Sequence, residues 1–332
     1  MSTLLEVRNL HVSFRIYKGT LRVLNGVDFT VNEKEKVGLI GETGCGKTTT
    51  MKTTLGILAG NAEIPAVEPK ARVLFKTKDI LELNSRELQQ IRRRNISMIF
   101  QDPTASLNPV FKIGDQIGDV VRYSIRDPKG EELSNKEIKE RTIEVLKAVA
   151  LPDPERIMEN YPVQLSGGMR QRVCIAMSLV SAQDLLIADE PGTSLDVTIE
   201  DQVLRLLKKL VEERGTSVIL ISHALGTVKG LADRTYVMYG GNMVEVAKTA
   251  DLFSDPLHPY TGGLFKAVPQ LTGGGVPEGI RGRVLDYLHP PKGCRFIERC
   301  NYAMPTCEKN MPQLFKVGND HEVACFLYGA LN

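Results

Sequence analysis

The 332-residue sequence is short of cysteine, of long apolar runs and of net charge, and each shortage excludes a class of protein. Six cysteines in a chain of this length exclude a small disulfide scaffold. No stretch approaches the roughly 18 apolar residues of a membrane-spanning helix, and "MSTLLEVRNLHVSF" lacks the basic start and apolar run of a signal peptide. We therefore expect a cytoplasmic chain with reduced thiols. The charge of +2 and the "RRR" at 92–94, without interleaved aromatics, predict no nucleic-acid partner.

The most specific stretch in the chain is "KVGLIGETGCGKTTTMKTTLG". Residues 37–40 read as a buried strand, residues 41–48 match the P-loop pattern G-x-x-x-x-G-K-[ST], and the following residues read as a helix. Glycines at this position let backbone N–H groups turn toward phosphates at the start of a helix. Lys47 is expected on the β- and γ-phosphates of a nucleotide and Thr48 on Mg²⁺. The alternative, a glycine turn with an exposed lysine, does not explain this context.

Two carboxylates follow a second apolar run, "DLLIADEP". Residues 185–188 suit a buried parallel strand, so Asp189 and Glu190 emerge at its carboxyl end. We expect Asp189 to hold Mg²⁺ and Glu190 to act as general base on the attacking water. A solvated strand end is the alternative, and the P-loop argues against it.

A second phosphate-binding turn is predicted in "LSGGMRQRVCIAMSLV". Ser166, Gly167 and Gly168 stand where a helix begins, so backbone donors point outward. A chain with one P-loop needs no second anion site for its own nucleotide, so this turn is expected to serve another subunit. Here the chain resembles the ATP-binding cassette (ABC) ATPases, whose cassettes dimerise head to tail around two ATP molecules.

The resemblance implies roles for further residues. Gln101 in "MIFQDPTASLNP" is similar to the Q-loop glutamine that contacts the metal and the water. Asp196 in "TSLDVT" resembles the D-loop residue that meets the partner cassette. His223 in "VILISHALG" resembles the switch histidine on the γ-phosphate, although a lone histidine is more often structural. Ala224 departs from the acidic residue that many such cassettes carry, which puts the local loop contacts in doubt.

An aromatic side chain upstream of the P-loop is expected to stack on adenine. We choose Phe14, with Tyr17 as an alternative and an ordinary core role for Phe14 as a second one. The predicted catalytic residues are Glu190, His223 and Gln101, and the predicted Mg²⁺ ligands are Thr48, Gln101 and Asp189. The predicted ATP-binding residues are Phe14, Tyr17, Gly41, Glu42, Thr43, Gly44, Cys45, Gly46, Lys47, Thr48, Thr49, Ser166, Gly167, Gly168 and Asp196.

The patterns predict an α/β fold with a P-loop NTPase core, and the resemblance implies that this core is of the ABC type, with an inserted helical subdomain and a small cysteine-rich C-terminal appendage. The predicted nucleotide-binding domain covers residues 1–245, with the helical subdomain at about 102–178, and the extension covers 246–332. Within the core, "TIEDQVLRLLKKLVEERG" predicts an amphipathic helix with an apolar stripe, capped by Gly215. We expect a solvated or mobile stretch at "SIRDPKGEELSNKEIKER", and a linker with a loop-dominated appendage after residue 245.

Four of the six cysteines fall in the last 40 residues: Cys294, Cys300, Cys307 and Cys325. Their intervals of five, six and seventeen residues match neither zinc pairs nor ferredoxin runs, so spacing selects no metal. "HPYTGGLFKAVP" and "PPKGCRFIERC" resemble the C-terminal extension of oligopeptide/dipeptide ABC importer ATPases. That resemblance implies a [4Fe–4S] cluster on these four cysteines, with zinc, or free or disulfide-linked thiols, as alternatives.

The resemblance implies an ATP-hydrolysing importer subunit, peripheral on the cytoplasmic face of the cell membrane. Peptides are the expected cargo, with oligosaccharides or nickel as alternatives. Implied partners are a second ABC ATPase (a related chain or a second copy), two transmembrane permease subunits and an extracytoplasmic solute-binding protein. A soluble ABC ATPase in nucleic-acid repair, ribosome recycling or cluster assembly is the rival hypothesis. An electron carrier is a third, which leaves the ATP site unexplained.

Overall fold

The computed structural model describes residues 2–126, 130–193, 195–267, 279–318 and 320–329, which fall into two compact units. The first unit holds residues 33–35 and 83–220, and the second holds residues 2–32, 36–82 and 221 onward. Most of the predicted glycine-rich linker "TGGGVPEG", and Ser194 of "TSLDVT", lie outside the described residues. None of the described helices is both long and apolar enough to span a bilayer.

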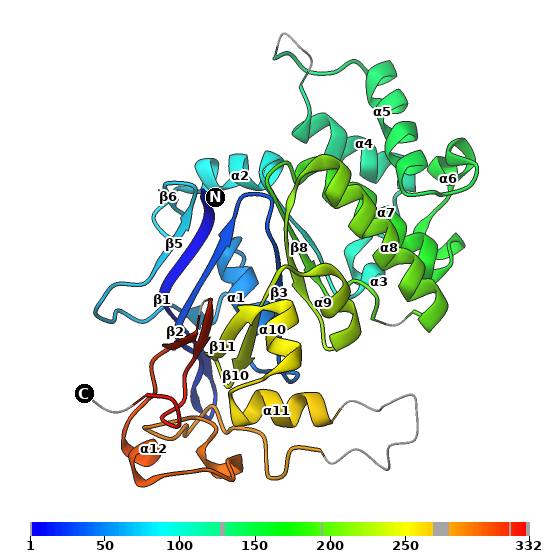
Figure 1. Ribbon diagram of the computed structural model, residues 1–332. Helices are drawn as coiled ribbons and strands as arrows, with labels where there is room; N and C mark the ends of the chain where they lie inside the picture. Colours follow the sequence, from blue (N-terminus) through cyan, green and yellow to red (C-terminus); the bar gives the residue numbers. More distant parts are fainter. Residues whose placement is uncertain (1, 127–129, 194, 268–278, 319, 330–332) are drawn as a thin grey trace. The chain divides into compact units, whose positions relative to one another are not determined.

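The first unit combines parallel strands with a group of helices (Figure 1). Its elements are α2 (Ser85–Arg94), β7 (Ile96–Ile99), α3 (Pro103–Ser106), α4 (Ile113–Ser124), α5 (Asn135–Ala148), α6 (Pro154–Glu159), η1 (Pro162–Gln164), α7 (Gly167–Ser181), β8 (Leu185–Asp189), α8 (Val197–Arg214) and β9 (Ser217–Ile221), whose last residue is counted with the second unit. The strands follow the order β9-β8-β7, and β7 and β8 pair in parallel. All five residues of β8 are buried, as its continuous apolar run predicts.

Local signals explain two helices of this unit. In α8 the apolar stripe buries Val203 and Leu207, and Gly215 ends the helix in the left-handed conformation with φ 65°, as predicted. Leu206, which lies next to Leu207 in this helix, is only half-buried. The stretch predicted to be solvated is partly helical, because Ser134 and Glu137 form a reciprocal capping box that starts α5.

The second unit contains two sheets (Figure 1). Its elements are β1 (Thr3–Ile16), β2 (Gly19–Asn32), β3 (Lys36–Ile40), α1 (Lys47–Thr54), β4 (Ala62–Glu63), β5 (Arg72–Phe75), β6 (Lys78–Asp79), α9 (Leu225–Leu231), β10 (Arg234–Tyr239), β11 (Asn242–Lys248), α10 (Thr249–Ser254), α11 (Pro259–Lys266), η2 (Ile297–Arg299), α12 (Pro305–Lys309), β12 (Phe315–Gly318) and β13 (His321–Val323). One sheet is antiparallel in the order β2-β1-β5-β6, with β4 also on β1. The other runs β12-β13-β11-β10-β3, in which β10 pairs with β3 in parallel.

The residues after 245 are more structured than predicted. The stretch expected to be a linker forms α10 and α11, and Tyr260 of α11 is fully buried. Its ring lies 4.7 Å from that of Tyr239 and 5.5 Å from that of Phe296, measured between centroids. Strand β13 pairs with β11, so the extension also lengthens the sheet. These residues therefore contain more helix and strand than the expected linker and loop-dominated appendage.

Candidate nucleotide-binding site

The P-loop has the strand–loop–helix context that the sequence predicts. Strand β3 ends at Ile40 and α1 begins at Lys47. Between them Gly41, Gly44 and Gly46 have φ values of 152°, 82° and 112°, which side chains rarely tolerate. A Cβ atom on Gly41 would lie 2.2 Å from the Met238 carbonyl oxygen, so this position admits no side chain.

Lys47 is held in place by the loop itself. Its Nζ donates to the carbonyl oxygens of Gly41 at 2.7 Å and Glu42 at 3.0 Å, and the residue is only 5% exposed. The cation is therefore fixed at the start of α1, where an incoming phosphate also meets the helix dipole. Nearby Cys45 is buried, and burial raises the pKa of its thiol, so it stays neutral beside the lysine.

Three side chains from beyond residue 245 contact the P-loop. The Tyr260 hydroxyl accepts a hydrogen bond from the Glu42 N–H at 2.7 Å, and the Tyr287 hydroxyl donates to the Gly44 carbonyl oxygen at 2.8 Å. The Arg299 guanidinium forms a two-pronged ion pair with the Glu42 carboxylate, at 2.7 and 3.0 Å. The sequence carries no local signal for these contacts, because their partners are more than 200 positions apart.

The remaining predicted residues of the second unit lie on strand ends and a hairpin. His223 follows β9 and is exposed, and Ala224 is the N-cap of α9. The Ser222 hydroxyl accepts a hydrogen bond from the Ala224 N–H at 2.9 Å, so a serine orders the turn after the strand. Phe14 is half-buried on β1, and Tyr17 is fully exposed in the hairpin between β1 and β2.

In the first unit the predicted catalytic carboxylate and the Q-loop glutamine meet. Gln101 Nε2 donates to Glu190 Oε2 at 2.8 Å, and the Thr193 hydroxyl lies 3.1 Å from the same oxygen. Glu190 has φ 49°, an unfavourable conformation for a non-glycine residue and one that is often found at functional sites. Asp189, immediately before it, is buried at the end of β8. Thr193 was missed because its pattern is that of an ordinary turn.

The predicted second phosphate turn opens α7. Ser166 is the N-cap, its hydroxyl accepts a hydrogen bond from the Met169 N–H at 3.3 Å, and it is exposed. A Cβ atom on Gly168 would lie 2.6 Å from Ile199 Cγ2, so a glycine lets α7 approach α8 closely. Asp196 is the exposed N-cap residue of α8 in the same unit. The start of α7 is thus accessible to a ligand from outside the unit.

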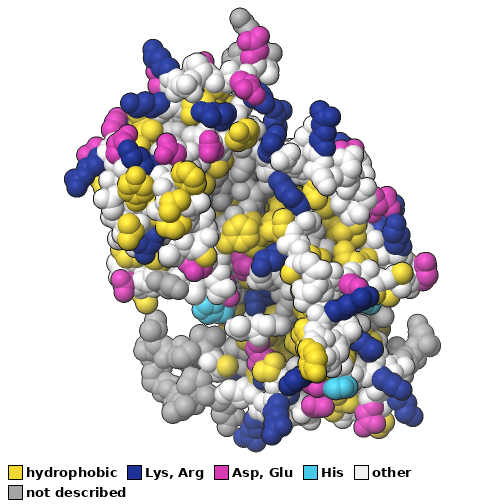
Figure 2. All heavy atoms as spheres, turned by 180° about the vertical axis from the view of Figure 1, so that it is seen from behind, with side chains coloured by type: hydrophobic (Ala, Val, Ile, Leu, Met, Phe, Trp, Pro, Cys, Tyr) yellow, Lys and Arg dark blue, Asp and Glu magenta, His cyan; other side chains and the backbone are white. Residues whose placement is uncertain are grey.

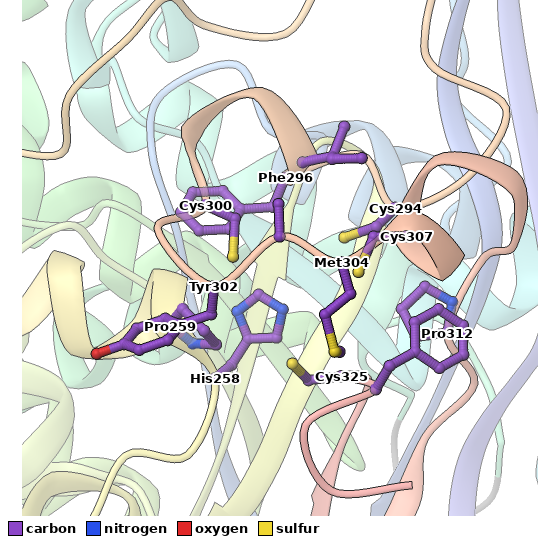
Figure 3. A pocket seen from close by; sticks show the side chains of 13 residues that line it. His258, Pro259, Cys294, Phe296, Cys300, Tyr302, Met304, Cys307, Pro312 and Cys325 are labelled. Carbon is purple, nitrogen blue, oxygen red and sulfur yellow. The ribbon is translucent and has the colours of Figure 1, made fainter. Parts of the chain in front are cut away.

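The four C-terminal cysteines line a single pocket in the second unit (Figure 3). All four are free thiols, and Phe296, Met304 and other apolar side chains complete the wall. Burial raises the pKa of Cys294 to about 11, and the nearby sulfurs of the other three cysteines add to the increase. As the side chains lie, no group of three or more His, Cys, Asp or Glu among the described residues is arranged to hold a metal ion.

Comparison with known sequences adds to this geometry. The sequence profile described as "ABC transporter" matches residues 24–193, just over half of the chain. The chain belongs to the ABC transporter family. A second profile, "Oligopeptide/dipeptide transporter, C-terminal region", matches residues 244–307. This ABC-type ATPase therefore has the C-terminal region of the peptide-transporter branch, and its P-loop NTPase fold is the one predicted.

Individual relatives match nearly the whole chain. The dipeptide transport ATP-binding protein DppD of Bacillus subtilis is 42% identical, covering 98% of this chain and 95% of the relative. The oligopeptide transport ATP-binding protein AppD of the same organism is 43% identical, covering 99% and 98%. These relatives are transport proteins, so the alternative of a soluble repair, recycling or cluster-assembly ATPase is wrong.

Solved structures support the assignment of the fold. The dimeric post-hydrolysis structure of the cassette MJ0796, bound to ADP and Pi, aligns with a TM-score of 0.64 at 26% identity, covering 74% of this chain and 98% of that one. The cbiO1 structure from Clostridium perfringens, part of the transporter complex cbiONQ, aligns with a TM-score of 0.62 at 25% identity, covering 77% and 92%.

Proposed function

We propose that this ABC ATPase hydrolyses ATP to drive the import of peptides, with oligosaccharides or nickel as less favoured cargoes. The observation that carries the proposal is the oligopeptide/dipeptide-type region at residues 244–307 behind a complete set of cassette motifs. The cassette explains ATP hydrolysis, and the C-terminal region supports the substrate class. In this proposal residues 1–245 are the nucleotide-binding domain, with a helical subdomain at about 102–178, and residues 246–332 are the extension.

The proposed chemistry divides between the motifs. Lys47 binds the β- and γ-phosphates and Thr49, with the other P-loop residues, supports them through the backbone. Mg²⁺ supplies charge neutralisation on the phosphates, and the side chains of Thr48, Asp189 and Gln101 fit the oxygen ligands it prefers. Glu190 takes the proton of the attacking water, and the hydrogen bond from Gln101 orients its carboxylate. His223 contacts the γ-phosphate, and Phe14 or Tyr17 stacks on adenine.

The proposed ATPase partner is a second cassette, either a related chain or another copy. The exposed Ser166 and the helix start behind it are suited to a phosphate that this chain's own P-loop does not hold. Two structures of the cassette MJ0796 are described as dimeric, which supports a second cassette as the partner. Gly167, Gly168 and Asp196 complete the surface that would face the partner's nucleotide.

The proposed membrane partners are two permease subunits, served by an extracytoplasmic solute-binding protein. Between Gln101 and the start of α7 the first unit exposes several large apolar side chains, among them Val110 at 71% and Phe111 at 54%. Figure 2 shows hydrophobic side chains at the surface of this helical part. Exposed apolar groups of this kind favour a protein contact. The chain would then sit peripherally on the cytoplasmic side of the membrane.

The proposed cofactor is a [4Fe–4S] cluster on Cys294, Cys300, Cys307 and Cys325, with zinc as the alternative. Four thiols line one apolar pocket, so they match in number the four irons of a cluster, which take one thiolate each, but their side chains would have to turn toward a common centre to bind it. Iron would also offset the raised thiol pKa, since a coordinating thiol is deprotonated. The cluster would stabilise the extension, as ATP hydrolysis needs no electron transfer.

Reconstitution tests the proposed function. The chain is co-purified from native membranes without tags on any other protein, and the bound proteins are identified by mass spectrometry. We expect two polytopic membrane proteins, and ATPase activity that rises when a peptide-loaded binding protein is added to liposomes containing the complex. Recovery with nucleic-acid or ribosomal proteins and no membrane protein would contradict the proposal. Stimulation by oligosaccharide or nickel instead of peptide would contradict the proposed cargo but not the proposed ATP-driven import.

A further inference from the structure

Residue 42 of the P-loop is bound from two sides by the C-terminal region. Its N–H donates to the Tyr260 hydroxyl at 2.7 Å, and its carboxylate receives both prongs of Arg299. Tyr260 is fully buried, and the side chain of Arg299 is 5% exposed, whereas that of Glu42 is 25% exposed. Because the guanidinium of Arg299 is planar and binds both carboxylate oxygens, the ion pair fixes the orientation of the Glu42 carboxylate as well as its distance from Arg299.

Arg299 is itself well anchored. Its Nε donates to the Arg281 carbonyl oxygen at 3.1 Å, and another guanidinium nitrogen donates to that of Ile280 at 3.1 Å. The guanidinium carbon lies 5.8 Å from the centre of the Tyr239 ring, within range of a cation–π contact. The Arg299 guanidinium is therefore held by contacts outside the P-loop, so its position restrains the Glu42 side chain.

A second anchor acts two residues further along the loop. The Tyr287 hydroxyl donates to the Gly44 carbonyl oxygen at 2.8 Å. In a planar trans peptide the N–H points away from the C=O, so holding the Gly44 oxygen also sets the direction of the Cys45 N–H, which donates to the Glu42 carbonyl oxygen at 3.2 Å inside the loop. Backbone N–H groups of this loop are the predicted phosphate donors, so a shift of the loop backbone would change the affinity for nucleotide.

The backbone of Arg299 is continuous with the cysteine pocket. The short helix η2 lies between its N-cap Phe296 and its C-cap Cys300, both of which line that pocket. The Ile297 N–H donates to the Cys294 carbonyl oxygen at 3.1 Å, and the Cys300 N–H donates to that of Ile297 at 3.2 Å. The Cys294 N–H in turn donates to the Cys307 carbonyl oxygen at 2.8 Å. These hydrogen bonds therefore connect the backbone of the cysteines to the backbone that carries the arginine.

We infer that Arg299 and Tyr287 are positioning residues of the P-loop, and that the arrangement of the cysteine pocket affects the affinity for nucleotide through Arg299. The distance in sequence between the cysteines and the phosphate motifs suggests a purely structural role for the cysteines. The ion pair with Glu42 instead connects the pocket to the loop. The inference needs only the nucleotide site described above and does not depend on which metal, if any, the cysteines bind.

The first test measures ADP affinity by calorimetry in the full-length chain. We expect Arg299→Met to raise the Kd for ADP by about tenfold, and Arg299→Lys to raise it less because the charge remains and the fork is lost. Tyr287→Phe should raise it severalfold by removing the hydroxyl alone. Arg283→Met changes an exposed arginine of the same region and should leave the Kd unchanged. In steady-state kinetics the KM for ATP should rise by a larger factor than kcat falls.

The second test asks whether the cysteines act through the ion pair. Cys300→Ser should weaken ADP binding in the otherwise natural chain, and the same substitution should have little further effect when Glu42→Gln is already present. Melting temperatures of all variants distinguish this result from general destabilisation. If Arg299→Met alone does not fold, the double variant Glu42→Gln with Arg299→Met, which leaves no unpaired charge, replaces it in the ADP measurement. Unchanged ADP affinity in both Arg299→Met and Tyr287→Phe, or equal effects of Cys300→Ser in the two backgrounds, would overturn the inference.

Discussion

The amide of Gln101 donates to the carboxylate of Glu190, with 2.8 Å between Nε2 and Oε2. The hydroxyl of Thr193 reaches the same oxygen at 3.1 Å. Two neutral donors on one carboxylate oxygen hold the group in one orientation without adding charge. The Glu190 carboxylate is therefore oriented before any substrate arrives, as its proposed role as general base requires.

Glu190→Gln should keep nucleotide binding and slow hydrolysis by roughly 10²- to 10⁴-fold, because the amide keeps the shape but takes no proton. Phosphate release measures the rate, and size-exclusion chromatography with ATP should show accumulation of dimers. Glu213→Gln is the matched control, since Glu213 lies on the exposed face of α8 beside Lys209. Natural turnover in Glu190→Gln, in an assembly with the partner site disabled, would remove this residue from the catalytic role.

Ser166→Arg should leave ADP affinity of the isolated chain nearly intact and abolish hydrolysis, because Ser166 faces outward at the start of α7. Lys47→Ala should weaken nucleotide binding directly, since Lys47 is buried in the P-loop. Mixing the two variants gives dimers in which one site carries both defects and the other carries neither. Partial recovery of ATPase activity supports shared sites. If mixed dimers form but recover no activity, the P-loop and the Ser166 turn of one chain act on the same nucleotide.

His258 should make stability depend on pH. Burial lowers its pKa to about 3, so the folded chain keeps the imidazole neutral, with its Nδ1 accepting from the Tyr260 N–H at 3.0 Å. The unfolded chain takes up the proton near pH 6.5, so this contribution is complete above about pH 6.5 and is lost as the pH falls toward 3. We expect the free energy of unfolding to fall by up to about 1.4 kcal/mol per pH unit in this window.

The urea midpoint at pH 7.5, 6.5, 5.5 and 4.5 measures this slope. His258→Asn keeps an N-cap acceptor without a titrating ring and should flatten the profile, even though loss of the ring lowers stability at every pH. His289→Asn is the control, because the His289 side chain is 85% exposed. An equally steep profile in His258→Asn would assign the pH dependence to other groups.

Protein prepared without oxygen should be brown and contain about four irons per chain if the cysteine pocket holds a cluster. Cys300→Ser should lose the visible absorption and make the C-terminal region more sensitive to protease. Cys174→Ala should keep the iron, because Cys174 is buried in the first unit, where burial raises its pKa to about 12. Stoichiometric zinc without iron would favour the zinc alternative, and metal-free protein would favour free or disulfide-linked thiols.

The parts of the fold that local sequence determines were predictable. The P-loop needs three glycines in restricted conformations, and Gly215 ends α8 in the left-handed region, so each appears as a pattern within a few residues. The helix α11 was missed because "HPYTGG" reads as a turn. Its signals are nevertheless present, with His258 as N-cap and Pro259 at the first helical position.

Contacts between distant segments could not be read from the sequence. Glu42 occupies a position of the P-loop pattern that any residue can fill, and nothing near Arg299 marks it as a partner for that loop. Only the packing of η2 and Tyr239 in the second unit brings the pair together. The same holds for Thr193, whose hydroxyl contacts Glu190 only because of the turn after β8.

The pairing of β13 with β11 has a consequence for how the protein is made. Val246 of β11 pairs with Glu322, so this sheet edge is completed by residues that follow β11 by about 70 positions. At a synthesis rate of roughly 5–20 residues per second, β11 waits several seconds with open backbone donors and acceptors along an apolar strand. During that interval the nascent chain presents the kind of edge that pairs with other chains. We therefore expect this stretch of β11 to be a binding site for chaperones during translation, and any truncation before residue 321 to make the exposure permanent.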